Sequence, residues 1–393
     1  MNDYHSDSIE VSVVMPCLNE ADTLAVCIKK AQTALSSAGI AGEIIIADNG
    51  STDGSQEIAR TMGCRLIPVA ERGYGSALMG GIAAARGKFV IMGDADDSYD
   101  FSETPRFVEK LREGFDLVQG CRLPAGGGQV LPDAMPWLHR WIGNPLLSRL
   151  ARMWFSVPIH DVYCGMRGFT KTFYERLNQR CTGMEFATEM IIRASISKAR
   201  IAEAPITLHP DGRKSHPPHL KTFRDGWRTL RLYLLYSPRW LFLIPGLALI
   251  LLGMLISAIG LSETRIGAVT FSAHTALMGG LSVLCGYQSV LFAILTKTYA
   301  VETNWLPEDA RYLRFYKLIN LERGLLISAL AILFGLALII VSFNQWRLTG
   351  FGRLDYAQTM RQLIPGTMIV VLGIQTILFS FFVSILGINR QRT

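Results

Sequence analysis

The sequence predicts an α/β domain, with a mostly parallel sheet flanked by helices, followed by an α-helical transmembrane domain of four spans. Two observations carry this prediction. Residues 1–235 alternate short apolar runs with helix-like stretches and carry many charges, a pattern typical of a Rossmann-like, doubly wound sheet. Residues 240–390 hold four apolar stretches, each reaching the roughly 20 residues that a helix needs to cross a bilayer.

In the first part, strand-like runs are followed by turns and helix-like stretches. Strands are expected at residues 11–16, 43–47, 64–69 and 89–92, and helices at 19–35, 55–62 and 77–85. Ligands of such sheets bind at the carboxyl ends of the strands. The side chains that directly follow each strand are therefore the candidates for a functional site.

The spans are expected near residues 241–260, 271–296, 324–344 and 364–388. The expected domains are a catalytic domain over 1–218, an amphipathic juxtamembrane helix over 219–239 and a transmembrane domain over 240–393. An ordinary core-facing helix is the alternative for residues 219–239. Basic residues gather in the loop 297–323, which puts this loop, the N-terminal domain and the C-terminus in the cytoplasm by the positive-inside rule.

Composition indicates which classes of binding partner and which cell compartment to expect. The net charge of +7 is modest, and the sequence has neither an arginine-rich arm nor zinc-finger spacing, so nucleic acid is not expected. The seven cysteines show no C-x-x-C pairing and are interpreted as reduced thiols of a cytosolic domain. The first ten residues are polar, so no cleavable signal peptide is expected.

The carboxylates after the strand at 89–92 are the most informative feature. Asp94 and Asp96 stand two residues apart, and such a pair can hold a hard divalent cation that also contacts a phosphate. Taken alone, this short motif is equally compatible with an acidic surface turn.

Three other segments are weak signals one at a time. Pro16-Cys17-Leu18-Asn19-Glu20 and Asp48 end the first two strands, where they can shape a nucleotide pocket or simply form turns. Gly73-Tyr74-Gly75 opens a helix and could cradle a phosphate.

In this order and spacing, the four motifs resemble the family-2 glycosyltransferases of GT-A fold. Gly120-Cys121-Arg122, Asp161-x-x-Cys164-Gly165-x-Arg167 and Phe186-Ala187-Thr188-Glu189 are similar to the dolichol-phosphate mannose synthase branch, which includes bacterial polyprenyl-phosphate glycosyltransferases. The resemblance covers roughly residues 10–235. It implies a multi-pass protein of the bacterial inner membrane that takes part in cell-envelope glycosylation and can form a homo-oligomer.

The resemblance also implies roles for individual residues. Asp94, Asp96, Arg122 and Glu189 would carry the reaction, and Asp94, Asp96 and Ser98 would hold Mg²⁺ or Mn²⁺. The nucleotide sugar would contact Pro16, Leu18, Asn19, Glu20, Asp48, Gly75, Asp94, Ala95, Asp96 and Arg213. Arg122 and Arg140 would bind the lipid phosphate, and Asp161, Gly165 and Arg167 would shape the sugar end of the site. For Arg167 and Glu189 the alternative is a structural ion pair.

The chain departs from the family pattern in several places. Asp48-Asn49 replaces two adjacent aspartates, and Ser98 stands where the family often has glutamine. The second lipid-phosphate arginine is Arg140 or Arg149.

The implied reaction is inverting transfer of a hexose from a nucleotide-diphosphate sugar of the GDP-mannose or UDP-glucose type to a polyprenyl phosphate. That acceptor is largely ionised at neutral pH and needs no general base. Two alternatives remain: a processive polysaccharide synthase, and a membrane scaffold with a relic transferase domain. Neither the sugar nor the base follows from the sequence.

Overall fold

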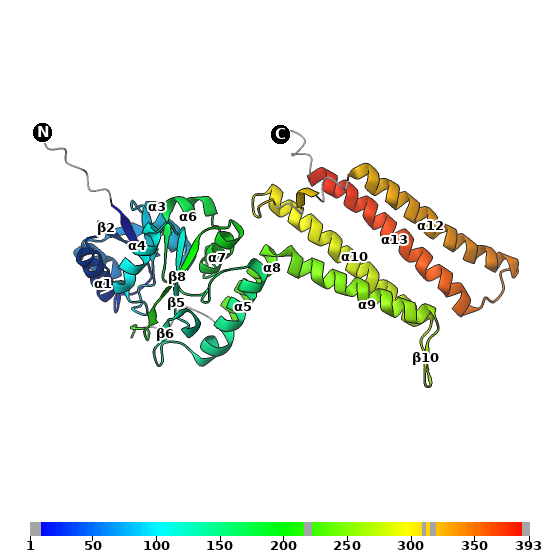
Figure 1. The fold of residues 1–393 in the computed structure, drawn as a ribbon, viewed down its shortest axis with the longest axis horizontal. Coiled ribbons are helices and arrows are strands. Elements are labelled where there is room, and N and C mark those ends of the chain that lie inside the picture. The colour runs from blue at the N-terminus through cyan, green and yellow to red at the C-terminus, as the bar shows by residue number, and fades with distance from the viewer. Residues whose placement is uncertain (1–8, 216–221, 309–311, 315–319, 387–393) are drawn as a thin grey trace. The chain divides into compact units, whose positions relative to one another are not determined.

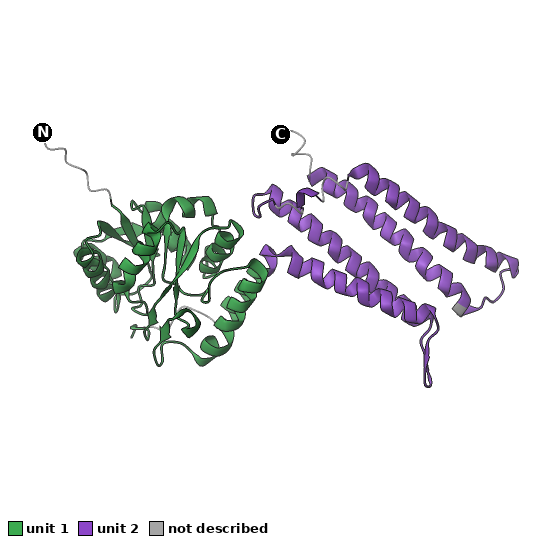
Figure 2. Ribbon diagram, viewed as in Figure 1, with its two compact units in different colours: residues 1–233 green, residues 234–393 purple. Residues whose placement is uncertain are grey.

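The computed structural model describes residues 9–215, 222–308, 312–314 and 320–386. The chain divides into two compact units, residues 1–233 and 234–393 (Figure 2). Helix α8 (Thr222–Tyr236) runs across the division between them. The predicted limit between residues 218 and 219 lies outside the described residues, and the predicted domain limits stay a prediction.

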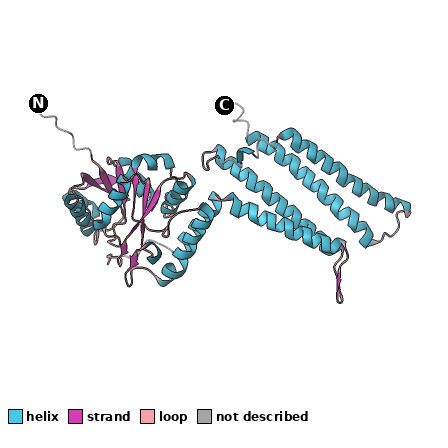
Figure 3. Cartoon of the chain, viewed as in Figure 1, coloured by secondary structure: helices cyan, strands magenta, loops and turns pink. Residues whose placement is uncertain are grey.

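The first unit is built on a seven-stranded sheet with the order β3-β2-β1-β4-β7-β5-β8 (Figures 1 and 3). Its strands are β1 Val11–Cys17, β2 Gly42–Asp48, β3 Arg65–Pro68, β4 Phe89–Met92, β5 Leu117–Cys121, β7 Arg167–Thr170 and β8 Ile201–Pro205. All neighbouring pairs are parallel except those of β7, which is antiparallel to β4 and β5. The predicted GT-A-like, mostly parallel sheet is confirmed.

Helices connect and cover these strands: α1 Leu24–Ser37, α2 Ser55–Thr61, α3 Tyr74–Ala84, α4 Thr104–Arg112, α5 Asn144–Phe155, α6 Lys171–Leu177 and α7 Phe186–Ile196. Helix α1 buries Leu24, Cys27, Ile28 and Ala31, the spacing of one helical face. It begins five residues later than predicted because Asn19 has a φ of 60°, in the left-handed region that helices exclude.

Helix α3 begins earlier than predicted, at Tyr74, so Gly75 lies in its first turn and Gly73 is the residue directly before the helix. Short strands β6 (Gln129–Val130) and β9 (Thr207–Leu208) pair outside the main sheet. After β9 the chain lies beside the loop that follows β4, where the His209 N–H donates to the Ser98 carbonyl.

The second unit contains four helices that are long and apolar enough to cross a membrane, over Arg239–Leu261, Ala273–Glu302, Leu321–Leu348 and Gln358–Leu386. They comprise η4 (Arg239–Leu243) with α9 (Ile244–Leu261), α10 (Ala273–Glu302), α12 (Leu321–Leu348) and α13 (Tyr356–Leu386). The four predicted spans are confirmed; residues 387 and 388 of the last lie outside the described residues. Helices α9 and α10 approach closely where Gly253 faces Gly279, as small residues allow in membranes.

Candidate active site

The site forms where β1 and β4, neighbours in the sheet, reach their carboxyl ends. The loop after β1 carries Glu20, and the loop after β4 carries Asp94 and Asp96. The Thr23 hydroxyl donates to the Ala95 carbonyl at 2.6 Å and ties the two loops together. Parallel strand pairing therefore brings into one site two motifs that stand about 75 residues apart.

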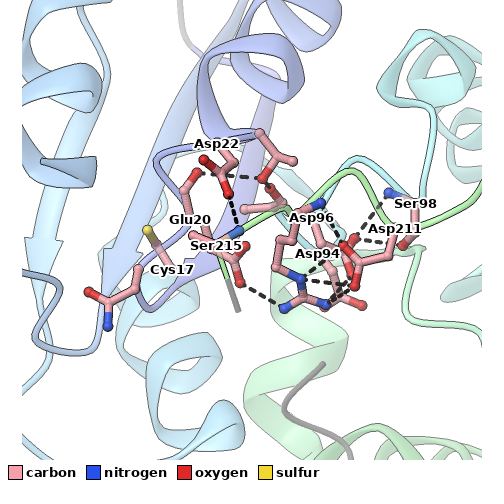
Figure 4. A network of polar contacts seen from close by, with 12 residues as sticks. Cys17, Glu20, Asp22, Asp94, Asp96, Ser98, Asp211 and Ser215 are labelled. Atoms are coloured by element: carbon pink, nitrogen blue, oxygen red, sulfur yellow. Dashed lines mark hydrogen bonds and ion pairs between the residues drawn. The ribbon is translucent and has the colours of Figure 1, made fainter. Parts of the chain in front are cut away.

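Arg213 joins the acidic residues of these loops. Its Nη1 lies 3.1 Å from Glu20 Oε1, and its Nη2 lies 3.0 Å from Asp96 Oδ2 and 2.6 Å from Asp211 Oδ2. Burial lowers the pKa of the guanidinium, but Asp211, Asp96 and Glu20 outweigh it and raise the pKa, so that Arg213 stays charged. Backbone N–H groups of Lys214 and Ser215 also donate to Asp22 (Figure 4).

Asp94 lies in the same site, close to Asp96 (Figure 4). Burial and the neighbouring Asp96 raise the pKa of its carboxyl group to about 6. The Tyr74 hydroxyl donates to Oδ1 at 2.8 Å. A Cβ on Gly165 would lie 2.7 Å from Oδ2, so only glycine leaves room for this carboxylate.

Asp96 is oriented by its own turn. The backbone N–H and the hydroxyl of Ser98 both donate to Asp96 Oδ1, at 3.1 and 2.6 Å. Ser98 thus fixes the carboxylate that carries the prediction of a metal site. Asp97, by contrast, forms an ion pair with Lys30 of α1 at 2.8 Å.

The predicted nucleotide-binding residues after β1 and β2 are held by the turns they form. Asp48 is buried and accepts the N–H groups of Gly50 and Ser51 and the side-chain amide of Gln56. Asn19 accepts the Thr52 N–H. Pro16 is paired with Ala47 in the sheet, and Leu18 is half-buried beside this turn.

The family departure at Asn49 has a structural use. Its amide group donates to the carbonyls of Val69 and Glu71, and its oxygen accepts the Gly73 N–H at 2.7 Å. Gly75, predicted to contact the nucleotide sugar, is buried with its Cα against the Cys181 carbonyl. Close backbone packing therefore explains these glycines without a phosphate.

Arg122 and Asp161, predicted for the lipid phosphate and the sugar end, form a buried bidentate ion pair. Arg122 Nε and Nη2 lie 2.7 and 2.9 Å from the two carboxylate oxygens, and the Arg122 backbone N–H also donates to Asp161. Its Nη1 points toward the Tyr99 hydroxyl at 3.5 Å. Tyr99 in turn accepts the Gly165 N–H, which connects this pair to the Asp94 side of the site.

Arg167 and Glu189 do not pair with each other, but Glu189 does form a structural ion pair, with Arg193. Arg167 is fully buried and donates to the carbonyls of Cys164 and Ala187. Glu189 pairs with Arg193 at 2.9 Å, one helical turn further along α7.

Arg140 lies in the π-helical turn η3 (His139–Gly143) and stacks over the Trp141 ring. None of the hydrogen bonds found within the described ranges joins it to the carboxylates. The structure therefore brings together Glu20, Asp94, Asp96 and Arg213, with Arg122 and Asp161 behind Tyr99, and leaves Arg140 apart.

Sequence reasoning missed four side chains that shape the site: Asp22, Tyr74, Tyr99 and Asp211. An aromatic residue between two glycines, as in Gly73-Tyr74-Gly75, was a usable signal for Tyr74. Asp211 and Asp22 left none, because their contacts depend on the return of the chain after β9.

Comparison with known proteins assigns the family. The model for glycosyl transferase family 2 matches residues 12–177, and that for the family-2 C-terminal transmembrane region matches residues 294–387. Low-salt glycan biosynthesis hexosyltransferase Agl6 of Haloferax volcanii is 37% identical over 96% of this chain and 89% of its own length. Dolichyl-phosphate hexose transferase of the same organism is 33% identical over 42% of this chain and 68% of its own.

A solved structure of glucosyl-3-phosphoglycerate synthase from Mycobacterium tuberculosis, with Mn²⁺ and UDP, matches with a TM-score of 0.43 at 21% identity. It covers 57% of this chain and 77% of that one. The two family models and the extended match to Agl6 are sufficient: the chain belongs to glycosyltransferase family 2 and is a membrane-embedded glycosyltransferase.

Proposed function

We propose that this enzyme transfers a hexose from a nucleotide-diphosphate sugar to a polyprenyl phosphate, with Mg²⁺ or Mn²⁺ bound at Asp94 and Asp96. The observation that carries the proposal is the junction of Asp94, Asp96, Glu20 and Arg213 at the carboxyl ends of β1 and β4. A metal-bound diphosphate suits this edge of the sheet, because the carboxylates can bind the cation and the guanidinium of Arg213 can bind the diphosphate.

The carboxylates at this site suit a metal ion that takes some of its ligands from the substrate. Among the residues that the structure describes, no group of three or more His, Cys, Asp or Glu side chains could hold a metal ion. Mg²⁺ is commonly bound through one or two carboxylates together with substrate phosphates and water. We therefore expect the cation to bind together with the nucleotide; once bound, it would stabilise the leaving diphosphate.

Arg213 has a second place in this proposal. It lies on Asp96 Oδ2, while Ser98 occupies Oδ1, so both oxygens of Asp96 already have partners. A cation at Asp96 would displace the guanidinium, which would then be available for the diphosphate. Arg213 thus keeps the carboxylates neutralised until the donor binds.

The acceptor phosphate needs positive charge but no general base, since its oxygen is ionised at neutral pH. Arg122 remains our candidate. Because Asp161 takes its Nε and Nη2, a phosphate would meet the Nη1 edge, beside the Tyr99 hydroxyl. Arg140 would meet the lipid phosphate further from the donor. In-line attack on the anomeric carbon would invert its configuration.

A lipid acceptor is supported by an aromatic face on the first unit. Trp137 is 67% exposed and Trp141 63%, and on helix α8 Phe223 is 85% exposed and Trp227 59%. The His139 ring bonds the Thr222 hydroxyl at 2.9 Å and links the two elements. Exposed aromatics on this scale are typical of contact with a membrane interface.

We also propose that the first unit lies on the cytoplasmic side of the membrane. The support is the basic content of residues 297–323, where Lys297 near the end of α10, Arg314, and Arg323 at the start of α12 are among the described residues. Arg311 and Lys317 of the same range lie outside the described residues. Single cysteines placed between the spans can be labelled in intact cells to test this assignment. A cysteine within residues 297–323 that reacts from outside the cell would reverse it.

The proposed reaction is tested by a transfer assay. The purified full chain in detergent is given polyprenyl phosphate, MgCl₂ or MnCl₂ and radiolabelled UDP- and GDP-hexoses. We expect label to enter a mild-acid-labile lipid from one donor, with a loss of at least about 100-fold for Asp96→Ala. Asp97→Ala is the matched control, because that carboxylate is paired with Lys30, and it should keep near wild-type activity. Equal loss in both variants, or no transfer from any donor, would count against the proposal.

A further inference from the structure

Tyr74 holds the carboxylate of Asp94 in place. Its hydroxyl donates to Oδ1 at 2.8 Å, while Oδ2 faces the Cα of Gly165. A tyrosine hydroxyl is protonated at neutral pH, so the phenol is the donor of this hydrogen bond. A charged acceptor makes this a strong hydrogen bond.

The backbone around Tyr74 is fixed by close contacts. Gly73 has a φ of 142°, and an added Cβ there would collide with the Thr182 carbonyl oxygen. An added Cβ on Gly75 would collide with the Cys181 carbonyl oxygen in the same way. The Ser76 N–H donates to the Thr182 carbonyl at 3.2 Å. The position of Tyr74 therefore depends on the backbone at residues 181 and 182.

That backbone is fixed in turn by Glu189. Its Oε2 accepts the N–H groups of Arg180 and Cys181 at 2.9 and 2.8 Å, and its Oε1 binds Arg193 Nε at 2.9 Å. The Glu189 side chain is 1% exposed and lies within helix α7. Continuous contacts thus lead from Glu189 through residues 180–182 and Tyr74 to Asp94.

We propose that Tyr74 is a positioning residue that orients Asp94 for the metal-bound diphosphate, and that Glu189 acts on the same carboxylate through residues 180–182. The inference rests on the proposed function, in which Asp94 and Asp96 meet the cation. It assigns Glu189 a role without contact with the substrate, in place of the catalytic role that the family resemblance implies. The glycines flanking Tyr74 then serve the close approach that keeps its hydroxyl on Asp94.

Binding of Mn²⁺ tests the inference independently of turnover. The full chain in detergent is titrated with MnCl₂ in the presence of UDP or of GDP, and free Mn²⁺ is followed by electron paramagnetic resonance. Tyr74→Phe removes only the hydroxyl and should weaken Mn²⁺ binding about 10-fold, the expectation for a hydrogen bond to a charged group. Tyr233→Phe removes a hydroxyl that bonds Tyr163 at 3.0 Å and should leave binding unchanged.

Variants of Glu189 test the longer connection. Glu189→Gln keeps an oxygen for the two backbone N–H groups and should bind Mn²⁺ within about 3-fold of the wild type, whereas Glu189→Ala should lose about 10-fold. The double variant Tyr74→Phe, Glu189→Ala should bind no more weakly than Glu189→Ala alone, because both changes act through one hydrogen bond.

The outcomes separate the two proposals. Wild-type protein that binds no Mn²⁺ with either nucleotide would overturn the proposed function. Normal wild-type binding with an unchanged Tyr74→Phe would overturn the positioning role alone. Losses that add in the double variant would show that Glu189 acts by a separate route and would refute the connection.

Discussion

Replacing Asp161 by asparagine should strongly destabilise the first unit, because the substitution leaves a buried arginine without its counter-charge. Asp161 is fully buried and Arg122 is 6% exposed. Two carboxylate oxygens receive three hydrogen bonds from Arg122, at 2.7, 2.9 and 3.0 Å. Removing one partner of such a pair costs about 3–5 kcal/mol. At roughly 2–4 °C for each kcal/mol, the unfolding midpoint should fall by on the order of 6–20 °C.

Thermal unfolding of the full chain in detergent, followed by intrinsic tryptophan fluorescence, measures this loss. Glu10→Gln is the matched control: it breaks a bidentate pair with Arg112, whose side chain is 48% exposed, and should cost no more than about 1 kcal/mol.

A double variant separates stability from activity. Arg122→Met with Asp161→Leu removes both charges of this buried pair and should recover most of the stability while transfer stays lost. The reasoning fails if Asp161→Asn costs no more than Glu10→Gln, or if the double variant is as unstable as Asp161→Asn.

Three further outcomes are expected. Because burial and Asp96 raise the pKa of Asp94 to about 6, the folded protein holds a proton between roughly pH 4 and 6 that the unfolded chain has released, and stability falls as pH rises through that window. Asp94→Asn should therefore raise the unfolding midpoint above that of the wild type at pH 7 but not at pH 4. A variant that unfolds at the wild-type midpoint at both pH values would contradict the raised pKa of Asp94. Gly279→Ile should destabilise the α9–α10 pair by about 1–3 kcal/mol in a detergent unfolding assay, whereas Gly226→Ala, in open space, should not. Trp141→Ala should raise the KM for polyprenyl phosphate in vesicles several-fold without changing nucleotide binding, and an unchanged KM would count against membrane contact by the aromatic face.

Much of the architecture follows from local sequence. Strand-like and helix-like stretches alternate visibly, and four apolar stretches of bilayer length leave few alternatives for the second unit. Asp94 and Asp96 could be singled out because they follow a fully buried strand, so that their place at the sheet edge is set by the chain itself.

The first residues of α1 and α3 could not be predicted correctly from the sequence, for a physical reason. Asn19 belongs to a turn because its backbone is left-handed and its amide oxygen accepts the Thr52 N–H, 33 residues away. The backbone at Tyr74, where α3 begins, is fixed by the carbonyl groups of Cys181 and Thr182, which pack closely against Gly75 and Gly73. Neither contact leaves a mark within a window of neighbouring residues.

The sequence by itself determined the fold class, the membrane spans and the position of Asp94 and Asp96 directly after a buried strand, because these depend on patterns within single segments of the chain. Only the tertiary structure decided their partners: Arg213 on Asp96, Asp161 on Arg122, and Glu189 on the backbone of residues 180 and 181. The first two pairings join positions 117 and 39 residues apart, and in all three the choice of partner depends on geometry and on the exclusion of water around buried charge.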